Sequence, residues 1–110
     1  MKGQNVILTA SVLALSALTR QRFVGLDGAT CAAGAKAFGV AEYNTDAGNM
    51  APCNVQGVIL VEAGSVLAVG AEVQSDANGK AIAKAAGLSN GFALDAATVD
   101  GDIIRIVRGI

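Results

Sequence analysis

The chain has 110 residues, which is enough for one compact domain. Hydrophobic residues make up 53% of it and its formal net charge is -1, which argues against intrinsic disorder and against a nucleic-acid-binding module. Because the chain contains no His, it lacks the commonest general base and the commonest metal ligand, so the composition disfavours an enzyme.

An apolar run opens the chain and extends from Val6 to Leu18. It follows Met1 and Lys2 as in a signal peptide, although a single lysine is a weak positive start. The run is too short to cross a bilayer, which takes about 20 apolar residues. We therefore predict that residues 1–20 form an extended N-terminal arm or a first strand that packs on a partner, with no membrane involved. Residues 21–110 are predicted to form a β-rich domain.

Short apolar runs separated by glycine-containing turns fill the rest of the chain. The longest, Val55 to Glu62, is rich in β-branched residues, and Asp27-Gly28 and Asn78-Gly79 are typical turn dipeptides. Helices at residues 9–18 and 80–86 are the less favoured alternative. Many short strands with turns at this spacing predict an all-β fold, a small single-domain β-barrel or sandwich. The expected strands lie at residues 23–26, 38–41, 55–62, 66–67, 72–74, 81–83, 92–94 and 103–107.

A weak internal repeat is visible at an offset of about 52 residues. Gly39-Val40-Ala41 aligns with Gly91-Phe92-Ala93, and Val55-Gln56-Gly57 aligns with Val107-Arg108-Gly109. A true repeat would mean two similar β-meanders packed as the halves of one barrel. Coincidence in a chain rich in Ala, Gly and Val is the other interpretation.

Two cysteines, Cys31 and Cys53, are too few for a zinc site, which takes four ligands. They could form one disulfide in an oxidising compartment, but buried free thiols are favoured because Cys often behaves as a small hydrophobic residue.

Other candidate chemistry fails on spacing. Gly79-Lys80 is followed by Ala81 and lacks the upstream glycine of a phosphate-binding loop, so it is predicted to be a hairpin tip. A modifiable carrier lysine at Lys80 would lack the flanking residues of the lipoyl type. No serine has a His to activate it. We therefore predict no catalytic residue, no bound metal and no cofactor.

The order of segments after residue 20 resembles the capsid cement (head decoration) family of tailed bacteriophages. The residues that carry the resemblance run from Arg22-Phe23-Val24 through the stretches VQGVILVEAG and GAEVQSDANGKA to GFAL and GDIIRIV. The most specific pieces are VEAG and SDANGKA in that order. Where members of the family tend to have a short glycine-containing turn before Arg-Phe-Val, this chain has Thr19-Arg20-Gln21-Arg22.

The resemblance implies a small β-rich, β-tulip-like structural protein that is not an enzyme. Such a protein is assembled in the host bacterial cytoplasm and binds the outer surface of the virion capsid, where it braces the shell against internal DNA pressure. The implied partners are the major capsid protein and further copies of itself, most often as a homotrimer and sometimes as a dimer, with no nucleic acid or membrane partner.

An assembly protein of this kind needs interfaces and no active site, and the apolar composition suits shared burial. We expect Val6, Ile7 and Leu8 in the N-terminal arm to add to a capsid strand or a neighbouring subunit, with Phe23 as a further interface residue. The alternative function is a capsid-displayed adhesion module that binds a glycan or protein of the host surface, although the chain has few aromatic residues for stacking on sugars.

Overall fold

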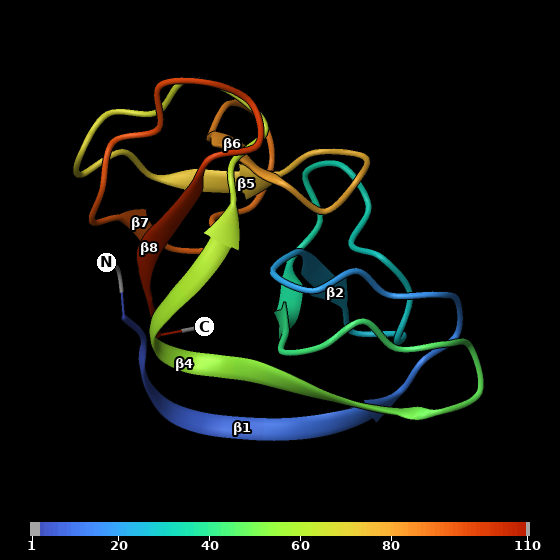
Figure 1. Ribbon diagram of the computed structural model, residues 1–110. Coiled ribbons are helices and arrows are strands. Elements are labelled where there is room, and N and C mark those ends of the chain that lie inside the picture. Colours follow the sequence, from blue (N-terminus) through green and yellow to red (C-terminus); the bar gives the residue numbers. More distant parts are fainter. Residues whose placement is uncertain (1–2, 110) are drawn as a thin grey trace.

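This computed structural model describes residues 3–109 of the chain. Within them the regular elements are all β-strands, joined by turns and loops, and there is no helix (Figure 1). The all-β fold expected from the sequence is confirmed. The strands are β1 (Asn5–Leu13), β2 (Phe23–Gly25), β3 (Ala37–Ala41), β4 (Met50–Glu62), β5 (Val73–Ser75), β6 (Ala81–Ala83), β7 (Phe92–Ala93) and β8 (Ile103–Arg108).

The long strand β4 organises the main sheet, whose order is β2-β3-β4-β8-β7 with β1 also paired to β4. Asn54 has partners on both of its edges, in β1 and β3, and Val58 has partners in β1 and β8. One edge of β4 therefore carries β1, and β3 and β8 share the other. Because β4 bends sharply midway (Figure 1), the sheet curls around its own inner face. Strands β5 and β6 form a separate hairpin.

The inner face of the curled sheet holds the core. Alternate residues of β4 and β8 point inward, as the two-residue period of a strand requires, and Ile59, Ile104 and Ile106 are completely buried. Phe23 of β2 packs into the same cluster. A second, smaller cluster around Leu18, Val24 and neighbouring small residues lies under the end of β1.

Strand β4 begins at Met50, earlier than the predicted start at Val55. The sequence hides this start because Pro52 lacks the N–H that a central strand uses. The Pro52 carbonyl oxygen accepts a bond from the Glu42 N–H, 3.1 Å away, just beyond the end of β3. The Pro52 nitrogen, which has no hydrogen to donate, therefore lies beyond the end of β3, where the sheet requires no hydrogen bond from it. The strand predicted at residues 66–67 is wrong, because Leu67 forms only an isolated bridge with Ala97.

The internal repeat is real at the level of hydrogen bonds. Each half contains a bridge of two reciprocal backbone bonds, between Leu18 and Thr45 in the first half and between Leu67 and Ala97 in the second. Each half also has a connecting segment that bonds to a strand further along, through Gln21 N–H to Ala41 O of β3 (2.9 Å) and Gly70 N–H to Ala93 O of β7 (2.7 Å). Strand β4 ends the first half and begins the second.

This repeat explains the unusual backbone of Gln21, the one non-glycine residue with a positive φ (64°) in the described part of the chain. Its counterpart is Gly70, with a φ of 84°. We expect Gln21→Gly to raise the free energy of unfolding by about 0.5–1 kcal/mol, since a side chain is strained in this conformation. Thermal denaturation should show a higher midpoint. Gln21→Ala keeps the β-carbon, and an equal gain in that variant would contradict the explanation.

The two most specific sequence pieces meet in space. Gly64 N–H donates to Ala81 O at 2.8 Å, and Glu62 forms an ion pair with Lys80 at 3.3 Å. The Asp76 carboxylate accepts the N–H groups of Asn78 and Lys80 and so fixes the turn of the β5–β6 hairpin. At the tip of this hairpin the Gly79 carbonyl oxygen accepts a hydrogen bond from the N–H of Phe23, 2.7 Å away. VEAG and SDANGKA therefore share a structural role, which is to hold the hairpin against the sheet.

Both cysteines are buried and unpaired, as favoured from the sequence. Burial raises the pKa of the Cys53 thiol to about 11 and also raises the pKa of Cys31. At pH 8 only about 0.1% of Cys53 is therefore thiolate, the reactive form. We expect a thiol reagent such as Ellman's to label neither cysteine in the folded protein and both after denaturation. Rapid labelling of the native protein would contradict this burial.

Candidate docking surface

Strand β1 lies at an open edge of the sheet. It pairs with β4 from Asn5 to Leu13, and no other strand pairs with it among residues 3–109. Beyond its end, Ala14 N–H donates toward β4, to Asn49 O at 2.9 Å, and Leu15 N–H donates the opposite way, to Gly28 O at 3.0 Å. Since successive N–H groups of a strand alternate in direction, those of Thr9 and Ser11 point out from the open edge.

This edge lacks the protection that natural proteins usually give to edge strands. Its nine residues, NVILTASVL, include no charged residue and no proline. Charged side chains and proline are the common means of preventing another strand from pairing with an exposed edge. Two register shifts, between Val6 and Leu8 and between Leu8 and Thr9, interrupt the pairing as a β-bulge and leave the segment from Thr9 to Leu13 regular. The segment from Thr9 to Ser11 can therefore accept a further strand, whereas the turn at Gly28 already lies against the Leu13 carbonyl oxygen.

The bulge also decides where the predicted interface side chains point. Val6 pairs with Gly57 and is partly buried against the core. Ile7 is the extra residue of the bulge, and its side chain is 80% exposed; that of Leu8 is 44% exposed. A β-carbon at Gly57 would lie only 2.5 Å from the Asn5 carbonyl oxygen, so glycine is required for the close approach of the two strands. Ile7 and Leu8 are thus available to a partner, and Val6 is largely not.

The prediction for Phe23 is corrected by its position in the structure. The sequence predicted it as an interface residue, but its side chain is 1% exposed and belongs to the main core. The hairpin tip at Gly79 bonds to its backbone, so a partner cannot reach it. Phe23 is a core residue and is not part of the docking surface.

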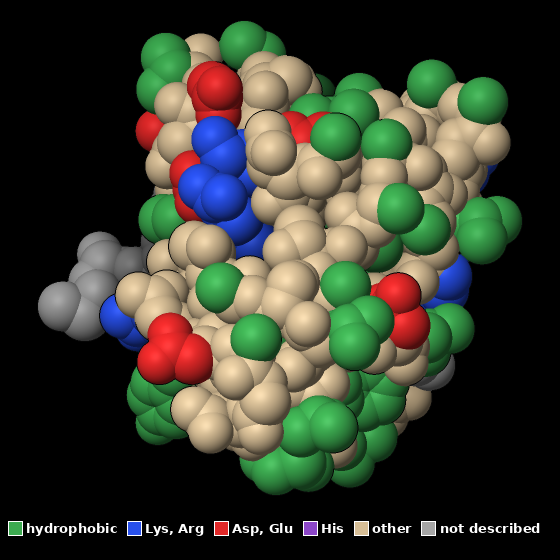
Figure 2. Space-filling model, turned by 90° about the vertical axis from the view of Figure 1, so that its right-hand side faces the viewer, with side chains coloured by type: hydrophobic (Ala, Val, Ile, Leu, Met, Phe, Trp, Pro, Cys, Tyr) green, Lys and Arg blue, Asp and Glu red, His purple; other side chains and the backbone are tan. Residues whose placement is uncertain are grey.

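Several exposed apolar residues that the sequence analysis did not single out extend the surface of Ile7 and Leu8. Figure 2 shows hydrophobic side chains gathered along the lower edge of the molecule, where β1 and the first half of β4 run in Figure 1. Leu13 could have been found from strand alternation, whereas Met50 becomes its neighbour only through the register of β1 with β4. We call this set the β1 surface: Ile7, Leu8, Leu13, Leu15 and Met50, each between 44% and 80% exposed.

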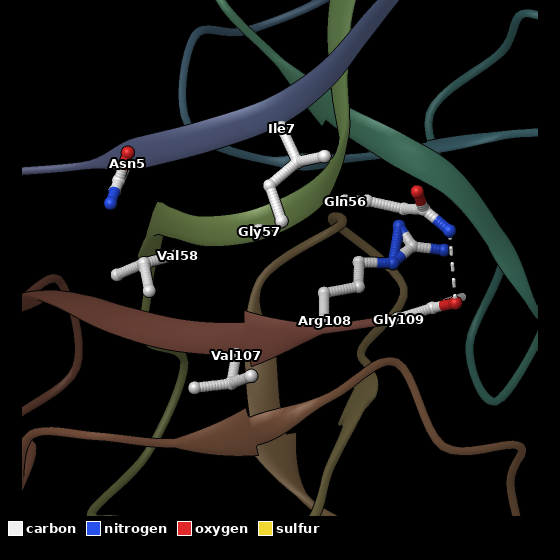
Figure 3. Close-up of a pocket in the computed structure, with 8 residues that line it drawn as sticks. All are labelled: Asn5, Ile7, Gln56, Gly57, Val58, Val107, Arg108 and Gly109. Carbon is white, nitrogen blue, oxygen red and sulfur yellow. Dashed lines mark hydrogen bonds between the residues drawn. The ribbon is translucent and has the colours of Figure 1, made fainter.

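A groove of about 400 Å³ lies on the outer face between β1, β4 and β8. Figure 3 shows Ile7, Val58 and Val107 around a floor at Gly57, with Gln56 and Arg108 at one end. The groove is mostly apolar because Gly57 carries no side chain and its neighbours are β-branched. It continues the β1 surface through Ile7.

Arg108 has an uncommon environment for a cation. Its side chain is 2% exposed, and its Nη2 donates to the carbonyl oxygen of Ala37. Burial lowers its pKa to about 10, and the Cys31 thiol acts in the opposite direction. Its Nε and Nη1 atoms are buried without a hydrogen-bond partner.

The ion pairs of residues 3–109 involving Glu62 and Lys80 serve a structural purpose. Glu62 lies between Arg22, at 3.1 Å, and Lys80, which also pairs with Asp100 at 3.0 Å. These ion pairs hold the hairpin and leave Lys80 engaged at a turn. No group of three or more potential metal ligands occurs within residues 3–109. In that same range no helix is long and apolar enough to span a membrane.

A small all-β domain with an unprotected edge strand and an apolar groove has the features of a protein that works by binding other proteins. Comparison with known families agrees: the model of the phage cement protein family matches residues 1–108. The chain belongs to this family, and it is a structural, capsid-associated protein of a phage virion.

Among solved structures, the chain is similar to the N base of the head fiber protein gp8.5 of bacteriophage phi29. The TM-score is 0.75 and the sequence identity 21%, over 93% of each chain. At this identity the similarity shows that the fold is shared. No curated protein matches the chain.

Proposed function

We propose that the protein binds the outer surface of the phage capsid through the β1 surface and cements the shell against internal DNA pressure. The proposed partner is the major capsid protein. The observation that carries the proposal is the open edge of β1, with no charge or proline and with exposed apolar side chains beside it. A strand added at this edge gains backbone hydrogen bonds and apolar burial together.

Repetition across the capsid lattice strengthens such a contact. Each backbone hydrogen bond contributes about 1 kcal/mol net, so a short added strand gives modest affinity at one site. If each protein spans two capsid subunits, the second contact forms at a high effective concentration. The same bridging opposes separation of the subunits when the packaged DNA pushes outward, and this is the cementing action.

Self-association is the second part of the proposal, with a homotrimer as the expected state and a dimer as the alternative. It is supported by exposed apolar residues far in sequence from the β1 surface, such as Val66, Val69 and Leu88, each more than 50% exposed. A net charge of -1 adds little repulsion between copies. Light-scattering mass after size exclusion should give about three times 10.9 kDa; a monomer would overturn self-association in solution.

Adhesion to the host is the second candidate function. The similar phi29 domain is the base of a head fiber, and this chain exposes two aromatic side chains, Tyr43 at 60% and Phe92 at 51%. Both activities can be measured with one preparation. Particles that lack the protein should release DNA at a lower temperature than particles to which purified protein is added back, and the protein alone should not bind host cells. Unchanged release together with cell binding would replace cementing by adhesion.

A further inference from the structure

Within residues 3–109 the guanidinium of Arg108 is a buried cation without a counter-charge. No carboxylate of residues 3–109 forms an ion pair with it, and of its three nitrogens only Nη2 has an acceptor. Buried polar groups in proteins are nearly always hydrogen-bonded, and an unpaired buried charge is strongly destabilising. Arg105, on the same strand, differs in this respect, because it bonds to the Asp95 carboxylate through two nitrogens.

Arg108 lies at the end of the apolar groove. Arg108 is one of the residues that line this end, together with Gln56 and Gly109 (Figure 3), while its guanidinium is buried beneath the surface. The Gln56 side chain donates from Nε2 to the Gly109 carbonyl oxygen at 3.3 Å, and this exposed bond lies beside the guanidinium in Figure 3. It is long for a hydrogen bond and therefore weak. Displacing the Gln56 amide would open a path from the groove to the unpaired nitrogens.

We propose that this end of the groove is a binding site for a carboxylate that stands next to an apolar side chain, contributed by a partner protein chain. The apolar side chain would fill the space over Gly57 between Ile7, Val58 and Val107. The carboxylate would take the place of the Gln56–Gly109 bond and accept hydrogen bonds from Arg108. Charge complementarity selects the carboxylate, since arginine is suited to planar anions and every other lining residue is uncharged.

The site does not depend on capsid binding, so it can be tested on the isolated full-length protein. The probe is N-acetyl-leucine, which has both a carboxylate and an apolar side chain. N-acetyl-leucinamide keeps the side chain and removes the charge, and acetate keeps the charge and removes the side chain. Two readouts apply: the thermal denaturation midpoint against ligand concentration, and the NMR signal of the Arg108 Nε–H.

We expect N-acetyl-leucine to raise the midpoint saturably and to shift the Arg108 signal. The amide and acetate should each bind at least tenfold more weakly. Arg108→Met should abolish the response, whereas Arg105→Met, a change on the outer face of the same strand, should keep it. Gln56→Ala should bind N-acetyl-leucine several-fold more tightly because it removes the competing bond.

Three results would overturn the proposal. Equal binding of N-acetyl-leucine and its amide would show an apolar groove in which Arg108 has only a structural role. Equal binding of acetate and N-acetyl-leucine would show a site for free small anions, and the proposal that a partner chain occupies it would be wrong. An Arg108 signal that stays unchanged in the wild-type protein would exclude the site even if the Met variant failed to fold.

Discussion

Gly28→Ala should lower the free energy of unfolding by about 3 kcal/mol. Gly28 has a φ of 90°, where a side chain costs about 1–2 kcal/mol. A β-carbon there would also overlap the carbonyl oxygen of Leu13 and press on the Val12 side chain. The backbone around the end of β1 would have to move and would lose the bond from Leu15 N–H to Gly28 O. Chemical denaturation at constant pH measures the difference.

Gly48→Ala is the matched control. Gly48 has a similar φ of 89°, but a β-carbon there would meet nothing within 4 Å. The free energy of unfolding of this variant should therefore fall only by the cost of placing a side chain at positive φ, about 1 kcal/mol. Equal losses of unfolding free energy in the two variants would show that the contact between the turn after β2, at Gly28, and the end of β1 adds no strain. That result would contradict the packing of β1 described here.

Replacing both Leu8 and Leu13 by Lys should weaken capsid binding at least about 100-fold. Full burial of a leucine contributes about 1.5–3 kcal/mol, so the exposed 44% and 58% of these two side chains together give about 1.5–3 kcal/mol. Burying two lysine charges in their place adds a further cost, which brings the loss above the 2.7 kcal/mol that corresponds to about 100-fold. Lysine on an edge strand also discourages strand pairing. The fold should survive, because these side chains are 44% and 58% exposed in the free protein. Binding is measured on capsids assembled without the protein.

Val66→Lys combined with Val69→Lys is the control for added charge. These side chains are 69% and 67% exposed and lie outside the β1 surface. Their replacement should change capsid affinity by less than about threefold. If this pair weakened binding as much as the β1 pair, the docking surface would not be on β1.

Local sequence patterns predicted most of the strands. Strands β3, β6 and β8 lie within one residue of their expected bounds, because short apolar runs and the Asn78-Gly79 turn act locally. The start of β4 was missed because Pro52 contradicts a central strand unless the end of β3 is known. Residues 66–67 have the residue types of a strand, but only Ala97 pairs with them.

The candidate surface was partly predictable. The apolar run at the start of the chain indicated that Ile7 and Leu8 contact a partner, since an apolar segment can be buried by a partner as well as by the protein's own core. The opposite orientation of Val6 depends on a bulge set by Gly57, far along the chain. Phe23 was misplaced because its burial depends on the β5–β6 hairpin, a contact between the two halves that no local pattern contains. The Arg108 site is likewise formed by residues from four strands, β1, β3, β4 and β8.

Hydrogen exchange of β1 in the free and capsid-bound protein is the most direct test of docking through the open edge. The outward N–H groups of Thr9 and Ser11 should exchange rapidly in the free protein, because no strand covers them. We predict that capsid binding slows their exchange by at least about tenfold, while amides around Val66 and Val69 change little. If the protein binds capsids and exchange at Thr9 and Ser11 stays as fast as in solution, docking through β1 is wrong.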